Sequence, residues 1–335
     1  MPLIKIADSN IEFACAIDDT VTRAALRAGL GMPYECNVGS CGTCKFELVE
    51  GQITSAWAEA PALSDRDRLK NRVLGCQAHP AGDCTVKVML AEQYLPLHRP
   101  KLFSAQLAAT REITHDIREF HFEVEPAVAF LPGQYALLSL PGVQGQRAYS
   151  MSNVASRTGV WQFLIKRKPD GRGTAMLFDR LRIGDSIGID GPYGNGYLRE
   201  DSPRDVVCVA GGSGISPMLS IAHAVMHSPR MAARSLHFFY GGRTQRDICG
   251  EAELRNQPGF GERLFFYPSL SIVDADTMWT GHVGFVHENI MPTIGATPSA
   301  YEYYFAGPPP MTQATQRTLM QNKVPLTQMH FDQFY

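Results

Sequence analysis

The chain has 335 residues, of which 44% are hydrophobic and 19% are charged, and its formal net charge is −2. This length predicts two or three domains, since one domain usually holds roughly 100–200 residues. The balanced charge argues against a nucleic-acid-binding module, which needs a clustered basic face. Eight cysteines are too few for a secreted scaffold stapled by disulfides. Six of the eight lie in the first 84 residues, so the cysteines are concentrated in the N-terminal part.

The amino terminus lacks a secretory pattern, because Met1–Ile6 leads into a polar, acidic stretch. Segment 206–226 is nearly uncharged and long enough to resemble a membrane span. Its centre reads Gly-Gly-Ser-Gly-Ile-Ser-Pro, which would break a helix exposed to lipid. A buried strand, a glycine turn and a helix explain the segment better. We therefore expect a soluble, cytoplasmic protein without contact to membrane or nucleic acid.

The first part of the chain predicts a small α+β domain. Alternating apolar and polar residues indicate strands at 3–7, 11–17, 45–51 and 85–90. Thr20 is expected to begin a helix over 21–29, and Gly29 to end it. Segment 95–102 contains two prolines and indicates a semi-rigid linker.

The middle of the chain predicts an antiparallel β-barrel, because short alternating strands are separated by glycine and proline turns. These strands are expected at 104–113, 117–124, 134–140, 147–153 and 159–168. One helix, over 174–181, interrupts them.

From residue 203 onward strands alternate with helices, which favours a doubly wound parallel sheet. Strands are expected at 206–210, 235–240, 263–268 and 301–307, and helices at 218–226 and 311–320. The chain is thus divided into three domains of different architecture, 1–97, 98–202 and 203–335.

Four of the early cysteines have the spacing C-x4-C-x2-C…C of plant-type [2Fe–2S] ferredoxins, namely Cys36, Cys41, Cys44 and Cys76. Gly39 and Gly42 would let backbone N–H groups point at the sulfur atoms of such a cluster. A zinc site fits less well, because zinc ribbons use two short cysteine pairs and only one is present. We predict an iron–sulfur cluster and assign Cys15 and Cys84 to the core.

Two segments of the middle domain suggest a flavin. The arginine of Arg147–Asn153 could pair with a pyrophosphate, Tyr149 could stack on an isoalloxazine ring, and Ser150 could reach its N5 atom. Gly171, Gly173 and Thr174 lead into the predicted helix, where free N–H groups bind anions. Alone, each could be a solvated strand or a structural turn; together they favour FAD.

Two further segments suggest a dinucleotide. Gly211, Gly212, Ser213, Gly214 and Pro217 join a strand to a helix, and glycines allow a pyrophosphate to approach the backbone. The pattern is not G-x-G-x-x-G, so it does not indicate a standard dehydrogenase. A second wall of the same site is offered by Gly307, Pro308, Pro309 and Met311. A structural turn is the alternative for each segment.

The order of these motifs resembles, from end to end, the NADH-dependent reductase components of bacterial multicomponent aromatic-ring and hydrocarbon oxygenases. The resemblance implies an N-terminal β-grasp [2Fe–2S] ferredoxin domain, an FAD-binding barrel and an NAD-binding domain similar to ferredoxin–NADP reductase. It also implies electron flow from NADH through FAD to the cluster. The acceptor would be a Rieske ferredoxin or a terminal oxygenase, and the protein would be a monomer.

The resemblance further implies roles for individual residues. The chemistry would involve Tyr149, Ser150, Asp332 and Phe334. Further cofactor contacts are implied at Arg147, Met151, Asn153, Lys166, Pro192, Tyr193 and Gly194, besides the glycine segments. Either Phe334 or Tyr335 would face the flavin. Ala306 stands where the family commonly has a cysteine near the nicotinamide.

The choice of nucleotide and acceptor leaves alternatives. Arg243 and Arg246 make the loop 241–247 basic, as a 2′-phosphate of NADPH would require, whereas the resemblance favours NADH. The same electron chain could serve another acceptor, such as a deoxysugar-forming dehydratase. A redox-sensing binding module without turnover is the alternative from another class of protein. No acid or base is required for electron transfer, so His79 and His98 receive no role.

Overall fold

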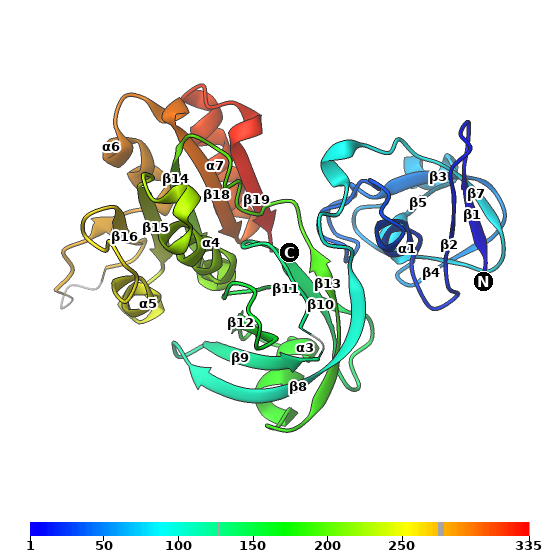
Figure 1. Cartoon of the computed structure of the whole chain (residues 1–335), viewed down its shortest axis with the longest axis horizontal. Helices are drawn as coiled ribbons and strands as arrows, with labels where there is room; N and C mark the ends of the chain where they lie inside the picture. Colours follow the sequence, from blue (N-terminus) through cyan, green and yellow to red (C-terminus); the bar gives the residue numbers. More distant parts are fainter. Residues whose placement is uncertain (126, 274–277, 335) are drawn as a thin grey trace.

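The computed structural model describes residues 1–125, 127–273 and 278–334, and it folds them into three successive units (Figure 1). The N-terminal unit is a mixed sheet of order β2-β1-β7-β3-β5, in which only β1 and β7 pair in parallel. Its strands are β1 (Leu3–Ile6), β2 (Glu12–Ala14), β3 (Lys45–Glu50), β5 (Arg72–Leu74) and β7 (Cys84–Lys87). A separate pair is formed by β4 (Ile53–Ser55) and β6 (Ala78–Pro80), and α2 covers Asp65–Leu69.

One helix, α1 (Val21–Arg27), packs on this sheet, and Val21, Ala25 and Leu26 share a buried core with the strands. Sheet and helix form the β-grasp that was expected. Gly29 follows the helix with a φ of 84°, which confirms the predicted end. Thr20 occupies the N-cap position, but its side chain makes no capping hydrogen bond.

The middle unit is an antiparallel sheet of order β11-β10-β13-β8-β9-β12. A bridge between Met151 and Phe163 joins its two edges, so the sheet closes into the predicted barrel. Its interior is filled by large side chains that include Trp161 and Phe122. The strands are β8 (Lys101–Glu112), β9 (Ile117–Val124), β10 (Tyr135–Ser139), β11 (Arg147–Ser150), β12 (Val160–Lys166) and β13 (Ser186–Tyr193).

Two features of the barrel differ from the expectations. Strand β13 was not predicted, because its two glycines and one proline are typical of turns. The helix expected over 174–181 is only partly α-helical, since α3 covers Arg172–Ala175 and a π-helical turn covers Met176–Arg180. The turn buries Leu177 and Phe178 in the barrel core, which pulls the backbone away from α geometry.

The third unit is a parallel sheet of order β17-β16-β15-β14-β18-β19. Its strands are β14 (Asp205–Gly211), β15 (Leu236–Gly242), β16 (Leu264–Leu270), β17 (His282–Val283), β18 (Tyr301–Gly307) and β19 (Met329–Gln333). The helices are α4 (Ile215–His227), α5 (Glu251–Arg255), α6 (Ile290–Ile294) and α7 (Pro309–Gln321). Edge strand β19 was not predicted, but the doubly wound parallel sheet is confirmed.

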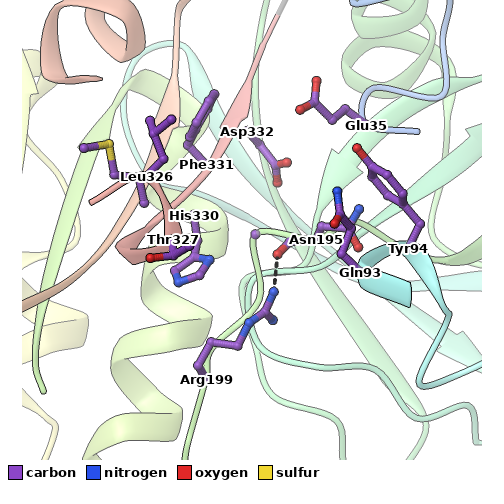
Figure 2. A pocket seen from close by; sticks show the side chains of 12 residues that line it. Glu35, Gln93, Tyr94, Asn195, Arg199, Leu326, Thr327, His330, Phe331 and Asp332 are labelled. Atoms are coloured by element: carbon purple, nitrogen blue, oxygen red, sulfur yellow. Dashed lines mark hydrogen bonds between the residues drawn. The ribbon is translucent and has the colours of Figure 1, made fainter. Parts of the chain in front are cut away.

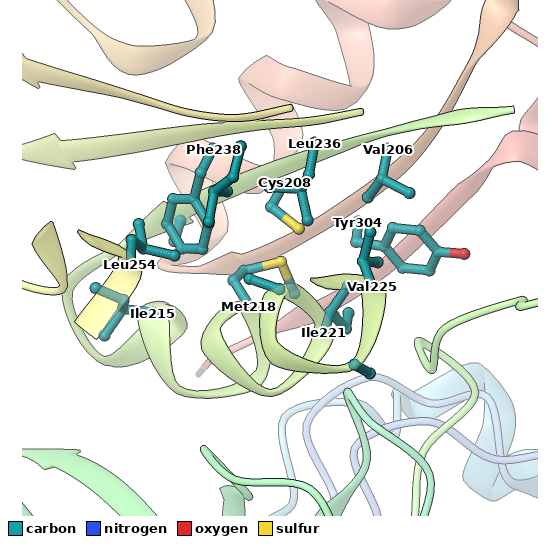
Figure 3. Close-up of a cluster of buried hydrophobic side chains, with 14 of the residues drawn as sticks. Val206, Cys208, Ile215, Met218, Ile221, Val225, Leu236, Phe238, Leu254 and Tyr304 are labelled. Atoms are coloured by element: carbon teal, nitrogen blue, oxygen red, sulfur yellow. The ribbon is translucent and has the colours of Figure 1, made fainter. Parts of the chain in front are cut away.

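Side chains of β14 alternate between two buried layers. Val206 and Cys208 pack with residues of α4 and α5, as Figure 3 shows, whereas Val207 and Val209 pack with residues of α6 and α7. The nearly uncharged segment 206–226 is therefore a buried strand, a turn and a helix, as expected. Within the described ranges, no helix is long and apolar enough to cross a membrane.

The turn between β14 and α4 is tight enough to require glycine. A Cβ atom on Gly214 would lie 1.9 Å from the carbonyl oxygen of Ala306, at the end of the neighbouring strand. We predict that Gly214→Ala lowers the stability of the protein by about 3 kcal/mol or more, because neither backbone segment can withdraw. Thermal unfolding followed by circular dichroism measures the loss.

Gly82→Ala is the matched control, because a Cβ atom there meets no heavy atom within 4 Å. Equal melting temperatures for the two variants would contradict the packing argument.

Candidate functional site

The predicted cluster ligands Cys44 and Cys76 meet at one end of the N-terminal sheet. Cys44 immediately precedes β3, and Cys76 follows β5 by two residues. These strands pair with Lys45 opposite Leu74, and the backbone N–H of Gly75 donates to the carbonyl of Cys44 at 2.9 Å. Two cysteines that are 32 positions apart in the chain are thus brought together by strand pairing.

The other two ligands lie in a loop whose backbone points at sulfur. The N–H groups of Ser40 and Cys41 lie 3.3 and 3.4 Å from Sγ of Cys36. Gly39 and Gly42 adopt φ values of 89° and 83°, which the loop needs to turn its N–H groups inward. The hydrogen bond from the Cys36 side chain lowers the pKa of Cys41 and so favours its thiolate. An all-cysteine donor set within such a loop fits a two-iron cluster.

The two segments predicted to hold FAD meet at Arg147. A Cβ atom on Gly173 would lie 3.3 Å from Cγ of Arg147, so these residues are in contact. The guanidinium donates to the carbonyls of Gln144 and Gln146, and in the described parts of the chain no carboxylate forms an ion pair with it. A half-buried arginine without an acidic partner, beside a glycine that leaves room, fits a phosphate.

Ser150 lies where the barrel meets the third unit. The buried hydroxyl of Ser216, in α4, donates to the carbonyl of Ser150 at 2.7 Å and accepts from the N–H of Leu164 at 3.2 Å. Ser220 donates to the carbonyl of Asn153 at 2.6 Å. Ser216 and Ser220 were not predicted from the sequence, because the sequence around a helical serine does not show which group its hydroxyl will bond. Burial raises the pKa of nearby Tyr149 to about 12, so its phenol stays neutral.

Several expected contact residues have their side chains engaged elsewhere. Met151 is fully buried in the barrel core. The amide of Asn153 donates to the carbonyl of Val160 and accepts from the N–H of Gln162. Thr174 uses its hydroxyl to hold the preceding turn. These side chains therefore shape the barrel.

The expected turn of Pro192, Tyr193 and Gly194 lies at the end of β13 and contacts the N-terminal unit. Tyr193 ends strand β13 and packs against Tyr34 of the N-terminal unit, with ring centroids 6.0 Å apart. The N–H of Gly194 donates to the hydroxyl of Tyr34 at 3.0 Å. The sequence motif is therefore part of the contact between the first two units.

The two glycine-containing segments of the third unit meet at the carboxyl ends of β14 and β18. A Cβ atom on Gly211 would lie 2.6 Å from Sδ of Met311, and Gly214 packs on Ala306. Gly307 lies beside Gly211, with a φ of 150°. Ser213 lies in the turn before α4, and Pro217 lies in the first turn of that helix. Pro308 is the N-cap of α7, and Pro309 is its first residue. This edge has the bare backbone that a dinucleotide requires.

Lys166 reaches this edge from the barrel. A Cβ atom on Gly212 would lie 3.5 Å from its Cδ atom, and its ammonium group lies 2.8 Å from Asp116. His115 lies 3.4 Å from Asp116 and 3.8 Å from Asp247 of the third unit. This network of polar side chains across the two units was not predicted, since Lys166 and Asp247 are far in sequence from His115 and Asp116.

The carboxyl-terminal strand completes the same region. Asp332 lies opposite Ala306 in the register of β18 and β19, and the N–H of Phe334 donates to the carbonyl of Gly307 at 2.9 Å. Tyr335 lies outside the described residues. Figure 2 shows Asp332 and Glu35 at a cavity of about 300 Å³ where the three units meet. Burial, with a smaller contribution from Glu35, raises the pKa of Asp332 from 3.8 to about 7.

Family models match three consecutive parts of the chain. A 2Fe-2S iron-sulfur cluster binding domain matches residues 4–81, an oxidoreductase FAD-binding domain 104–197, and an oxidoreductase NAD-binding domain 208–317. The chain is 38% identical to the ferredoxin–NAD(P)+ reductase CarAd of Metapseudomonas resinovorans, over 96% of both proteins. It is 37% identical to the ferredoxin–NAD+ reductase component of the alkene monooxygenase system of Xanthobacter autotrophicus, over 96% of this chain and 97% of that protein. The chain belongs to the ferredoxin–NAD(P)+ reductase components of oxygenase systems.

A solved structure of this family has the same fold over the whole length of the chain. The ferredoxin reductase in carbazole 1,9a-dioxygenase superposes with a TM-score of 0.91 at 35% identity, covering 100% of this chain and 98% of that one. The protein is therefore an oxidoreductase that transfers electrons from NADH through FAD to a [2Fe–2S] cluster. Bound FAD would accept two electrons from NADH and pass them singly to the cluster, while the protein sets the positions and surroundings of the cofactors. The predicted family, fold and cofactors are confirmed.

The carboxyl group of Asp332 makes stability depend on pH. Between pH 3.8 and about 7 the folded protein retains a proton that the unfolded chain releases, so this group favours the folded state less as pH rises. We predict that Asp332→Asn, which cannot ionise, raises the melting temperature relative to wild type by several degrees at pH 8 and by much less at pH 5. Asp201→Asn, an exposed site, is the control and should show no such trend. A pH-independent difference for Asp332→Asn would contradict the argument.

Proposed function

We propose that this protein delivers electrons from NADH to a Rieske ferredoxin or to the terminal component of a multicomponent oxygenase. Curated relatives include the alkene monooxygenase component named above and a phenol 2-monooxygenase reductase component of a Pseudomonas, which is 31% identical over 94% of this chain. The observation that carries the proposal is a direct contact between the flavin barrel and the cysteine loop, residues 36–44. Gly194 of the barrel donates to the hydroxyl of Tyr34, which stands two residues before this loop. An electron can thus leave the barrel for the cluster without a second protein.

We assign the cofactor contacts as follows. Arg147 and Gly173 hold the pyrophosphate of FAD, Tyr149 stacks on its ring system, and Ser150 lies at N5. The bound NADH would lie along the glycine edge, which is lined by Gly211, Gly212, Ser213, Gly214, Gly307 and Pro308, with Lys166 beside it. Phe334 and Asp332 lie at the end of this edge. The four cysteines of the loop ligate iron.

We propose that residues 1–97 bind the [2Fe–2S] cluster, residues 98–202 bind FAD and residues 203–335 bind NADH. We further propose that the protein acts as a cytoplasmic monomer that does not bind nucleic acid. The near-zero net charge supports the last point. The family matches fall within these three segments.

The preference for NADH can be tested against the basic loop. Arg243 and Arg246 are exposed, and neither forms an ion pair with any described residue. We predict that kcat/KM for NADH exceeds that for NADPH by about tenfold or more, and that the double variant Arg243→Ala/Arg246→Ala lowers the value for NADPH most. Steady-state reduction of ferricyanide measures both values. A higher kcat/KM for NADPH than for NADH in the wild-type protein would contradict the proposed preference for NADH.

The electron path can be cut at the cluster. We predict that Cys41→Ser removes the [2Fe–2S] absorbance and lowers cytochrome c reduction about 100-fold or more, while NADH still bleaches the flavin. Stopped-flow absorbance and iron analysis measure these effects.

Cys84→Ser is the control, because Cys84 is another cysteine of the N-terminal unit. Its thiol donates only to backbone carbonyls, and a serine hydroxyl can make the same hydrogen bonds. The variant should retain iron and cytochrome c reduction. Zinc in place of iron, or loss of flavin reduction in Cys41→Ser, would contradict the proposed function.

A further inference from the structure

Three buried tyrosines form the contact between the cysteine loop and the flavin barrel. Tyr34 stands two residues before Cys36, whereas Tyr135 and Tyr193 lie opposite each other on β10 and β13. The ring of Tyr193 lies 6.0 Å from each of the other two rings, measured between centroids. None of the three is more than 4% exposed. The contact is therefore a packed core and not a hydrated surface between two domains.

The hydroxyl groups of this contact are satisfied by the opposite unit or by the barrel. Tyr135 donates to the backbone carbonyl of Glu35, the residue that precedes the ligand Cys36. Tyr193 donates to Asp190 at 2.9 Å, and Asp190 forms an ion pair with Arg27 of α1 at 2.7 Å. Burial raises the pKa of Tyr135 well above its ordinary value, so its hydroxyl keeps the proton that it donates. Among the hydrogen bonds that the described barrel residues make to the N-terminal unit, the one from Tyr135 ends closest in sequence to a proposed cluster ligand.

The same residue lies next to the flavin side of the barrel. Tyr135 pairs with Ser150 in the register of β10 and β11, and Ser150 is the residue assigned to N5 of the flavin. The backbone of Tyr135 is thus tied to the proposed flavin contact, and its side chain is tied to the loop that carries Cys36. No other described residue has both connections in the hydrogen bonds and strand pairings of the structure.

We propose that Tyr135 is a positioning residue that sets the separation of flavin and cluster for electron transfer. The inference rests on the proposed function and deepens it. Each transfer oxidises the reduced flavin by one electron and reduces the cluster by one, and two transfers follow each NADH. No bond between heavy atoms forms or breaks, so the rate depends on distance and environment. The rate therefore falls as the separation of the two cofactors grows.

Tyr135→Phe in the full, cofactor-loaded chain tests the proposal, because it removes only the hydroxyl. We expect wild-type contents of FAD and iron, wild-type midpoint potentials and wild-type reduction of the flavin by NADH. The rate of cluster reduction in stopped-flow absorbance should fall about tenfold or more. Hydrogen–deuterium exchange of the amides in 36–44 should rise, which reports the loosened loop without reference to turnover.

Tyr94→Phe is the matched control. Tyr94 lies at the same contact, with its ring 6.3 Å from that of Tyr34, but its hydroxyl makes no hydrogen bond to any residue described by the structure. It should leave both readouts unchanged. Arg27→Gln breaks a second tether without altering Tyr135, and should slow cluster reduction with potentials retained, even if Tyr135→Phe fails to fold.

The outcomes separate the two proposals. Cluster reduction and amide exchange at wild-type values in Tyr135→Phe would overturn the positioning role, while the proposed function would stand. A shifted cluster potential, or iron loss in both Tyr135→Phe and Arg27→Gln, would also overturn it, since the tyrosine would then serve stability alone. Failure of NADH to reduce the cluster in the wild-type protein would overturn the proposed function itself.

Discussion

The hydroxyl group of Ser216 is the contact on which the arrangement of the nucleotide-binding unit and the flavin barrel depends. It is 1% exposed, and it bonds to two different strands of the barrel, donating to Ser150 and accepting from Leu164. A buried hydroxyl with both partners satisfied contributes modestly, but its removal leaves two backbone groups unpaired at a cost of about 1–3 kcal/mol each. Ser216 also stands two residues after Gly214, in the first turn of α4. The proposed dinucleotide loop is thus fixed to the strand that carries the proposed flavin contact.

A continuous line of contacts then leads from the proposed dinucleotide loop to the proposed iron ligands. Ser216 binds Ser150, Ser150 pairs with Tyr135 across β10 and β11, and Tyr135 binds the carbonyl of Glu35 beside Cys36. The barrel is the common element, because its strands contact both of the other units (Figure 1). Three units that pack on one another can therefore place three cofactors in a fixed order. The chemistry of electron transfer needs this order more than it needs any single acidic or basic group.

Much of this organisation can be predicted from the sequence, since it is encoded by local patterns. The strand predicted over 117–124 has the same bounds as β9. The glycine segment 211–217 begins at the carboxyl end of a buried strand, as predicted. Other features depend on partners that no local pattern contains. Strand β13 forms despite its glycines and proline because neighbouring strands pair with it on both sides. The tertiary structure there overrides the intrinsic preference for a turn.

Individual side chains show the same division. Arg147 and Gly173 are 26 positions apart, and both were predicted at one site because each belongs to a recognisable motif. Met151 and Tyr193 also belong to motifs, yet their side chains pack into the barrel core and the contact with the N-terminal unit. A motif identifies which segment approaches a cofactor, whereas the alternation of a strand decides which of its side chains do so. That decision requires the position of the sheet relative to its neighbours.

At Ala306, the side chain and the backbone have different roles at the proposed dinucleotide edge. Its methyl group is fully buried in the core beneath α4, and its carbonyl oxygen occupies the space that a side chain on Gly214 would need. Strand β18 therefore contributes to this edge through its main chain, with Asp332 of the adjacent strand lying opposite Ala306. A larger residue at 306 would have to fit a core that already contains Tyr304 and Met218. Close packing of α4 on this strand, and the placement of Ser216 that follows from it, accordingly favours a small side chain at the position.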